Sequence, residues 1–195
     1  MPIKPDREYR SFTEFKAVEE NDGFFVRGYA STFEPYLMYH DNDTGIDYFE
    51  RVLPEAFNGV DLSDAIFQYD HQGRVLARSR NNTLRLWVDE HGLAVEADLS
   101  LSDAARGIYD DIKNGLVYQM SFAFSVAEEE YDRDTHTRII RRFRKIYDVS
   151  AVSIPANPGT EISARSYYAG VAEQEAQELR RRADQIKRIR ILTSL

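Results

Sequence analysis

Apolar and polar residues alternate along much of the chain, and this period of two is typical of half-buried β-strands. Short turn sequences, Asn-Asp-Gly at 21–23 and Asp-Glu-His-Gly at 89–92, separate two pairs of such runs. Because turns of this kind join antiparallel strands, two β-hairpins are predicted. The first combines residues 11–19 with 24–33, and the second combines 83–88 with 93–99.

Four further apolar runs predict strands at residues 65–71, 117–126, 137–143 and 145–154. A polar segment joins the second of these runs to the third, so we expect those two to pair as an antiparallel hairpin. Residues 39–45 are polar and are predicted to form a loop.

Two segments have helical patterns. Ser102 can cap a helix whose apolar residues recur every three to four positions, and Gly115 can end it. Residues 53–57 predict a short helix that is entered through Pro54. Many strands and few helices indicate an α+β fold dominated by β-structure.

The composition changes at Ala169, after which Glu, Gln, Ala, Arg and Ile dominate. Apolar residues then recur at alternating steps of four and three, as in a helix with a narrow apolar seam. They are Ala172, Ala176, Leu179, Ala183 and Ile186. We therefore expect a barrel-like domain at residues 1–168 and a helical tail at 169–195, which either docks a partner or lies solvated on the domain.

Ser121 interrupts an otherwise apolar strand, where a buried hydroxyl costs about 1–3 kcal/mol unless it is hydrogen-bonded. Alternation puts Ser121, Ala123 and Ser125 on one face. The opposite face is formed by Met120, Phe122 and Phe124. The small side chains on the face of Ser121 would let a substrate backbone approach the hydroxyl.

Two other predicted strands supply partners for this serine. His71 ends one strand just before a turn, and Asp148 lies on the face that we expect Ile146 and Ser150 to share. A serine, a histidine and an acid are the components of an activated nucleophile, its base and an orienting group. The residues therefore indicate a hydrolase in which His71 takes the proton of Ser121 and Asp148 holds the imidazolium.

Other interpretations of these residues stay open. A serine in a strand is often satisfied by backbone groups. Ser150 and Ser153 are alternative hydroxyls, Asp70 is an alternative acid, and Asp148 could pair with Arg144 or Lys145. A serine–lysine dyad using Lys113 or Lys145 is a further option.

Composition narrows the class of protein. The 195 residues contain no cysteine, which excludes disulfides, thiolate nucleophiles and Cys-ligated zinc. A net charge of -8 argues against a general nucleic-acid binder. Neither a signal-peptide core at residues 1–8 nor an apolar run long enough to span a membrane is present, so we expect a cytoplasmic setting.

Two further segments and three histidines contain residue types that occur in metal or nucleic-acid sites. The acidic residues 41–50 superficially resemble a calcium loop, but the glycine falls one place early and no amphipathic helices flank it. His40, His91 and His136 share no ligand spacing, so no metal or other cofactor is expected. The basic residues 138–145 interleave with apolar ones and predict a strand with one solvated face.

Six segments stand out when they are taken together in chain order. They are Gly-Tyr-Ala-Ser-Thr-Phe at 28–33, Leu-Pro-Glu-Ala-Phe at 53–57, Asp-His at 70–71, Gly-Leu-Ala-Val-Glu-Ala at 92–97, the serine strand at 115–124, and 148–158. In this order they resemble the prohead (capsid maturation) serine proteases of tailed bacteriophages, which are related in fold to herpesvirus assemblin. The resemblance runs from about Phe25 to Ile162.

The resemblance implies an antiparallel β-barrel ringed by a few helices, with His71 as base and Ser121 as nucleophile. Asp148 stands where family members often have Glu, and Glu55 stands where a glycine is expected. The implied function is a serine endopeptidase that cleaves scaffold, or the scaffold-like arm of the major capsid protein, and itself. It would act inside the immature prohead, in the host cytoplasm.

The resemblance also allows self-association and assigns no nucleic-acid or membrane partner. It would place scaffold or shell docking, or a self-cleavage site, in the tail at 169–195. The alternative function is a catalytically inactive member of the same fold that binds scaffold during capsid assembly.

Overall fold

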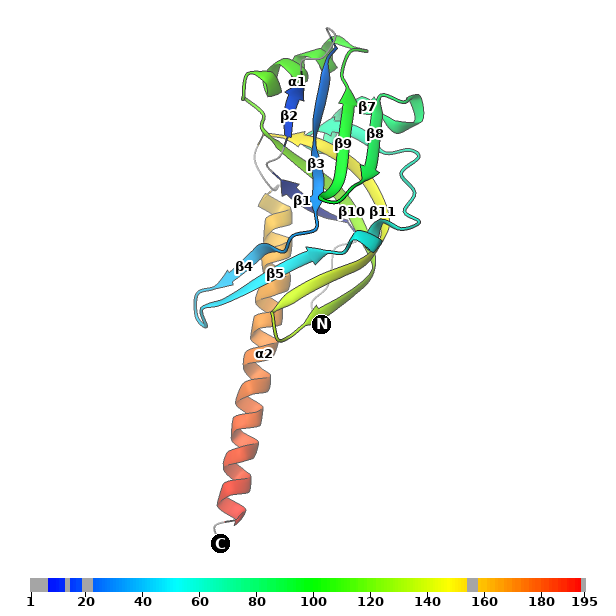
Figure 1. Ribbon diagram of the computed structural model, residues 1–195. Coiled ribbons are helices and arrows are strands. Elements are labelled where there is room, and N and C mark those ends of the chain that lie inside the picture. Colours follow the sequence, from blue (N-terminus) through cyan, green and yellow to red (C-terminus); the bar gives the residue numbers. More distant parts are fainter. Residues whose placement is uncertain (1–6, 13–14, 19–22, 154–157, 194–195) are drawn as a thin grey trace.

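The computed structural model describes residues 7–12, 15–18, 23–153 and 158–193. Over these ranges the fold is mixed α+β and strand-dominated, with one seven-stranded and one four-stranded sheet (Figure 1). The predicted fold class is therefore confirmed at this level. A closed antiparallel barrel is not confirmed in the described ranges, because the strands divide between two sheets and two of the pairings are parallel.

The seven-stranded sheet is built around two long strands, β10 (Gln119–Asp132) and β11 (Thr137–Val152), which form an antiparallel hairpin. Strand β1 (Glu8–Phe12) pairs with the free side of β10. On the other side, β11 is long enough to pair in parallel with two strands, β5 (Ile46–Val52) near its start and β6 (Ile66–Tyr69) near its end. The sheet is completed by β4 (Tyr36–Asp41) beside β5 and β7 (Gln72–Arg78) beside β6.

The four-stranded sheet has the order β2 (Phe15–Val18), β3 (Phe25–Thr32), β9 (Gly92–Asp98), β8 (Leu84–Val88). Its apolar face and that of the larger sheet share one core, in which Phe122 stacks on Phe124 with ring centroids 4.6 Å apart. Gly92 is required where β9 approaches β3, because a Cβ there would lie 1.9 Å from the Ser31 carbonyl oxygen.

Several sequence predictions are confirmed. The hairpin β8–β9 forms, and β2 pairs with β3. Helix α1 (Asp103–Lys113) begins after Ser102, whose hydroxyl accepts a hydrogen bond from the Ala105 amide. A 3-10 helix, η1 (Pro54–Phe57), forms at the predicted short helix.

Other predictions are wrong in their boundaries. The run 11–19 is not one strand, because its ends belong to β1 and β2 in different sheets. Part of the predicted loop 39–45 is the end of β4, and β5 and β7 were missed. The predicted strands 137–143 and 145–154 are one strand, β11, with residue 154 outside the described ranges. Short η2 (Ser79–Asn81) links β7 to β8.

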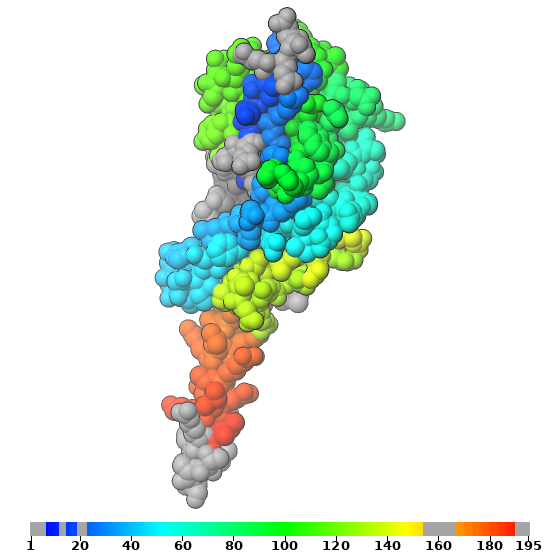
Figure 2. Space-filling view, viewed as in Figure 1, coloured from blue at the N-terminus to red at the C-terminus, as the bar shows by residue number. Residues whose placement is uncertain are grey.

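Helix α2 (Pro158–Thr193) begins earlier than the change in composition at Ala169 predicts. Tyr168 and Ala172 are buried beside Tyr48 of β5, and this contact fixes the base of the helix. Beyond it the helix extends away from the sheets (Figures 1 and 2). Leu179 and Ile186 of the predicted seam are exposed there. Among the described helices, none combines the length and the apolar composition that a membrane span requires.

Candidate active site

Ser121 lies near the start of β10, opposite Ser11 of β1 on one side and Ser150 of β11 on the other. The alternation predicted for this strand holds, since Met120, Phe122 and Phe124 belong to the apolar core. The hydroxyl therefore lies on the opposite face of the sheet. Ser121 is 1 % exposed.

His71 lies in the two-residue turn that joins β6 to β7. Asp70 and His71 both have positive φ, 48° and 57°, as a type I′ hairpin turn requires. Non-glycine residues seldom adopt this conformation, and Asp and His tolerate it better than most. The Asp70 carboxylate accepts hydrogen bonds from the Ser153 amide and hydroxyl, both at 2.9 Å, which tie the turn to the end of β11.

Asp148 lies on β11 opposite Ala123, on the same face of the sheet as Ser121. A register shift follows, so that Ile146 pairs with Phe124 and joins the core. The prediction that Ile146 shares the face of Asp148 is therefore wrong, because a bulge in the strand reverses the alternation. Asp148 is fully buried.

The turn brings the His71 ring between the other two side chains. His71 Nε2 lies 2.7 Å from Ser121 Oγ, and His71 Nδ1 lies 2.5 Å from Asp148 Oδ1. The three predicted site residues, which come from three different segments, therefore form one continuous hydrogen-bonded chain. This arrangement can take a proton from the serine and stabilise the resulting imidazolium with the carboxylate.

Two more groups hydrogen-bond to the Asp148 carboxylate. Ser150 Oγ donates to Oδ1 at 3.0 Å, and Arg7 Nη2 donates to Oδ2 at 2.5 Å. With His71, these groups compensate the burial of the carboxylate, which is costly for an unpaired ion. Tyr9 also packs edge-on against the His71 ring, with centroids 4.6 Å apart.

Arg7 and Tyr9 were not found from the sequence. The alternate positions of Arg7, just before β1, and of Tyr9 and Ser11 within it were the available signal, but the pairing of β1 with β10 has no local sequence mark. The alternative residues have other partners. Asp70 binds Ser153, Ser150 donates to Asp148, and the Lys145 ammonium lies 5.1 Å from the centre of the Tyr147 ring.

A buried ionic cluster lies on the face of β1 opposite the one that contacts His71. Arg10 donates to Glu50 and Glu8, and Arg138 donates to Glu8, Glu50 and Glu129. Burial raises the pKa of Glu8, but the hydrogen bond from Arg138 and the charge of Arg10 outweigh it and lower that pKa from 4.5 to about 2. The cluster therefore joins β1 to β5 and β11 through ionised groups.

The acidic segment 41–50 forms the end of β4, a turn and β5. Asp41 accepts hydrogen bonds from the Asp43 amide and the Thr44 hydroxyl, Asp47 pairs with His40, and Glu50 belongs to the ionic cluster. In the described part of the chain, no group of three or more His, Asp or Glu side chains has a metal-binding arrangement.

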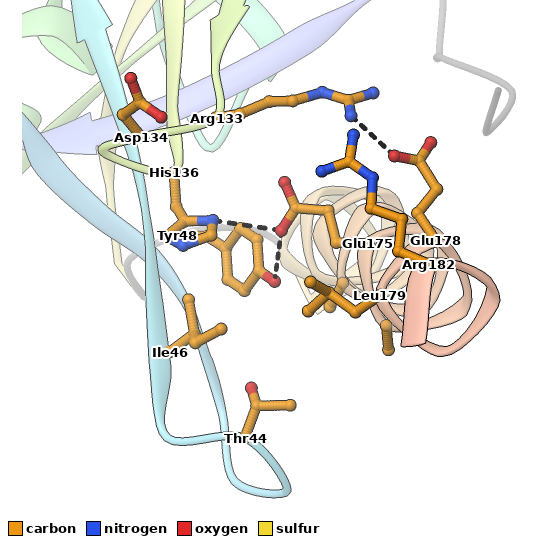
Figure 3. Close-up of a pocket in the computed structure, with 12 residues that line it drawn as sticks. Thr44, Ile46, Tyr48, Arg133, Asp134, His136, Glu175, Glu178, Leu179 and Arg182 are labelled. Carbon is orange, nitrogen blue, oxygen red and sulfur yellow. Dashed lines mark hydrogen bonds and ion pairs between the residues drawn. The ribbon is translucent and has the colours of Figure 1, made fainter. Parts of the chain in front are cut away.

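A cavity of about 390 Å³ lies between α2 and the turns of the β4–β5 and β10–β11 hairpins (Figure 3). Glu175 of α2 accepts from Tyr48 and pairs with His136, while Glu178 pairs with Arg133. Ser121, His71 and Asp148 are not among its lining residues. The cavity therefore belongs to the contact between α2 and these hairpins and is separate from the serine site.

Comparisons with known proteins agree with the resemblance. The chain is 27% identical over 164 residues to the prohead protease of Enterobacteria phage HK97, covering 82% of this chain and 68% of that protein. It is 33% identical over 92 residues to the prohead protease of Escherichia phage T5, covering 47% of this chain and 40% of that protein. A solved structure, the bacteriophage T4 capsid assembly protease gp21, matches with 13% identity and a TM-score of 0.46, covering 77% of this chain and 99% of that one.

A family model described as caudovirus prohead serine protease matches residues 12–175. The match includes Ser121, His71 and Asp148 and leaves out Arg7 and Tyr9. Because it spans most of the sequence, the chain belongs to the caudovirus prohead serine protease family.

Proposed function

We propose that this chain is a serine endopeptidase in which Ser121 is the nucleophile, His71 the general base and Asp148 the orienting acid. The observation that carries the proposal is the pair of hydrogen bonds made by one imidazole, 2.7 Å to Ser121 Oγ and 2.5 Å to Asp148 Oδ1. Membership of a family of serine proteases supports it independently.

The reaction follows from these contacts. Ser121 Oγ attacks the scissile carbonyl carbon as its proton passes to His71 Nε2. The tetrahedral intermediate collapses, the C–N bond breaks, and the imidazolium gives the same proton to the leaving amine. Water then hydrolyses the acyl-enzyme with His71 as base, and the serine hydroxyl is restored. Asp148 keeps the Nδ1 proton oriented and stabilises the cation in both steps.

The proposed substrates are the scaffold protein, or the scaffold-like arm of the major capsid protein, and the chain itself. The proposed place of action is the interior of the immature prohead, in the host cytoplasm. Family membership and the names of the HK97 and T5 relatives support this assignment. Self-association stays a prediction, and no observation favours a non-catalytic scaffold-binding role.

We also propose that the tail, residues 169–195, docks on the scaffold or shell through the part of α2 beyond its contact with Tyr48. Leu179 and Ile186 are 64% and 53% exposed there. Large apolar side chains that are exposed on one helix segment are typical of a docking surface.

Replacing the nucleophile tests the endopeptidase directly. Proheads assembled with the Ser121→Ala variant should package the protein but retain uncleaved scaffold or capsid protein. Ser125→Ala is the matched control, because Ser125 lies on the same strand face and its buried hydroxyl has no hydrogen-bond partner among the described residues. Normal processing by Ser121→Ala would contradict the proposal.

A further inference from the structure

Gln119, at the start of β10, is a buried residue whose side-chain oxygen has no partner. It is 8 % exposed, and its Oε1 atom accepts no hydrogen bond from any described residue. Most buried polar groups in proteins have such a partner, and an acceptor that is left without one destabilises the folded chain. The presence of a glutamine here therefore needs an explanation other than packing.

The position of Gln119 connects it with the nucleophile. It precedes Ser121 by two residues on one strand, so the two side chains point to the same face of the sheet and start about 7 Å apart. Across the sheet Gln119 pairs with Val152, whose side chain has no polar atom. The unpaired oxygen thus lies close to the place where a substrate must bind in order to react with Ser121.

His71 determines which part of a bound peptide lies near Gln119. The ring contacts Tyr9 and Asp148, and both of these residues pair with Ala123. His71 therefore lies on the Ala123 side of the nucleophile, and Gln119 lies on the other side. The leaving amine must be near His71 Nε2 to receive its proton. The acyl part of the peptide consequently extends toward Gln119.

The chemistry of the oxygen selects the group that it can bind. An amide oxygen accepts hydrogen bonds and cannot donate them, so it does not match the carbonyl oxygen of the scissile bond. The nearest donor in the acyl part of a peptide is the backbone N–H of the residue that supplies the scissile carbonyl. Gln119 is therefore suited to hold this backbone group.

We propose that Gln119 is a substrate-binding residue, and that its Oε1 atom accepts a hydrogen bond from the backbone N–H of the residue that supplies the scissile carbonyl. The inference rests on the proposed function of Ser121 and adds a binding contact to it. The contact helps to hold the carbonyl carbon within about 3–3.5 Å of the hydroxyl, as attack requires. It also excludes proline at this substrate position, because proline has no N–H.

The Gln119→Met variant tests the residue, because methionine has a similar length and no amide. On a peptide that spans a processing site of the scaffold or capsid protein, kcat/KM should fall about three- to tenfold, as loss of one hydrogen bond predicts. The melting temperature should rise by about 2–4 °C, because an unpaired acceptor is no longer buried. An unchanged kcat/KM, or a lower melting temperature, would overturn the inference.

Ser125→Ala is the matched control. Ser125 lies on the same strand face, and its buried hydroxyl also has no partner among the described residues, but it is about 13 Å along the strand from Ser121. Removal of this hydroxyl should leave kcat/KM at the wild-type value. An equal fall in kcat/KM for both variants would assign the effect to the buried face in general and overturn a specific contact of Gln119.

A change in the substrate tests the same contact without relying on the folding of a variant. The peptide is made a second time with an ester oxygen in place of the backbone N–H of the residue that supplies the scissile carbonyl. Wild type should cleave this analogue about three- to tenfold more slowly than the parent peptide. Gln119→Met should cleave the two at similar rates, because its contact is already absent. Equal rates in wild type, or the same loss in both enzymes, would overturn the contact.

A small fluorophosphonate separates this inference from the proposed function, because the reagent has no peptide backbone for Gln119 to hold. Ser121 should therefore be labelled at the same rate in Gln119→Met and in wild type. Equal labelling with an unchanged kcat/KM would overturn the contact and leave the nucleophile assignment standing. Absence of labelling and of peptide cleavage in wild type would instead overturn the proposed function and this inference with it.

Discussion

At the residue scale, the candidate site depends on one imidazole held from both sides. His71 contacts Ser121 through one ring nitrogen and Asp148 through the other. Ser121, His71 and Asp148 were predicted from residue type and strand position, because a serine and an acid in apolar strands each need a partner. Arg7 and Tyr9 could not be predicted, since their role follows from a strand pairing between residues more than a hundred positions apart.

Ser150 gives a prediction at this scale. Ser150→Ala removes one of the hydrogen bonds to Asp148 Oδ1. A hydrogen bond to a charged group is worth about 1.5–3 kcal/mol, so we expect kcat to fall about tenfold or more while KM stays nearly constant. Ser150→Thr keeps the hydroxyl and should restore much of the rate. Steady-state kinetics on a peptide substrate check this, and an unchanged kcat in Ser150→Ala would contradict it.

At the element scale, the β6–β7 hairpin positions His71. The strand before this turn was predicted and the strand after it was missed, since β7 begins with exposed Gln72 and Gly73 and shows no regular alternation. Strand β5 was missed for a similar reason, because its pattern is interrupted by a charged residue. Glu50 faces inward there, since Arg10 and Arg138 neutralise its charge. Buried ions and register shifts follow from partners that a local pattern does not contain.

The turn itself can be tested through Asp70. Valine at this positive φ adds strain of about 1–3 kcal/mol and removes both hydrogen bonds to Ser153. Asp70→Val should therefore lower both the free energy of unfolding and the rate of Ser121 labelling. Asp70→Asn tolerates the same backbone and keeps an acceptor oxygen, so it should stay close to wild type. Urea denaturation with labelling kinetics measures both effects, and equal behaviour of the two variants would contradict the turn assignment.

At the scale of the whole molecule, the ionic cluster connects β1, β5 and β11 and makes stability depend on pH. The pKa of Glu8 is about 2 in the folded chain, below its ordinary 4.5. Its contribution is therefore fully present above pH 4.5 and is lost as the pH falls from there toward 2. Glu8→Gln should lower the free energy of unfolding at pH 7 and flatten its decrease between pH 5 and 3.

Urea denaturation at several pH values measures this dependence. Glu90→Gln is the matched control, because the Glu90 side chain is 87% exposed, and its curve should follow that of wild type. A Glu8→Gln curve parallel to wild type over the whole range would show that Glu8 does not contribute in this way.

The long helix gives a second prediction at this scale. Ile186→Glu puts a charge on the exposed apolar seam, whereas Gln185→Glu puts the same charge on the neighbouring position. If the tail docks on scaffold or shell, incorporation into proheads should fall severalfold for the first variant and not the second, with no change in melting temperature for either. Equal incorporation of both variants would refute docking through this seam.

The central claim is that His71 activates Ser121, and the most direct test is the rate of covalent adduct formation at that serine. Intact-protein mass spectrometry during prolonged exposure to a fluorophosphonate should show one adduct on Ser121 in wild type and none in Ser121→Ala. In His71→Ala the rate should fall by roughly 10⁴-fold. Undiminished labelling of Ser121 in His71→Ala, as a serine–lysine dyad would give, would contradict the account.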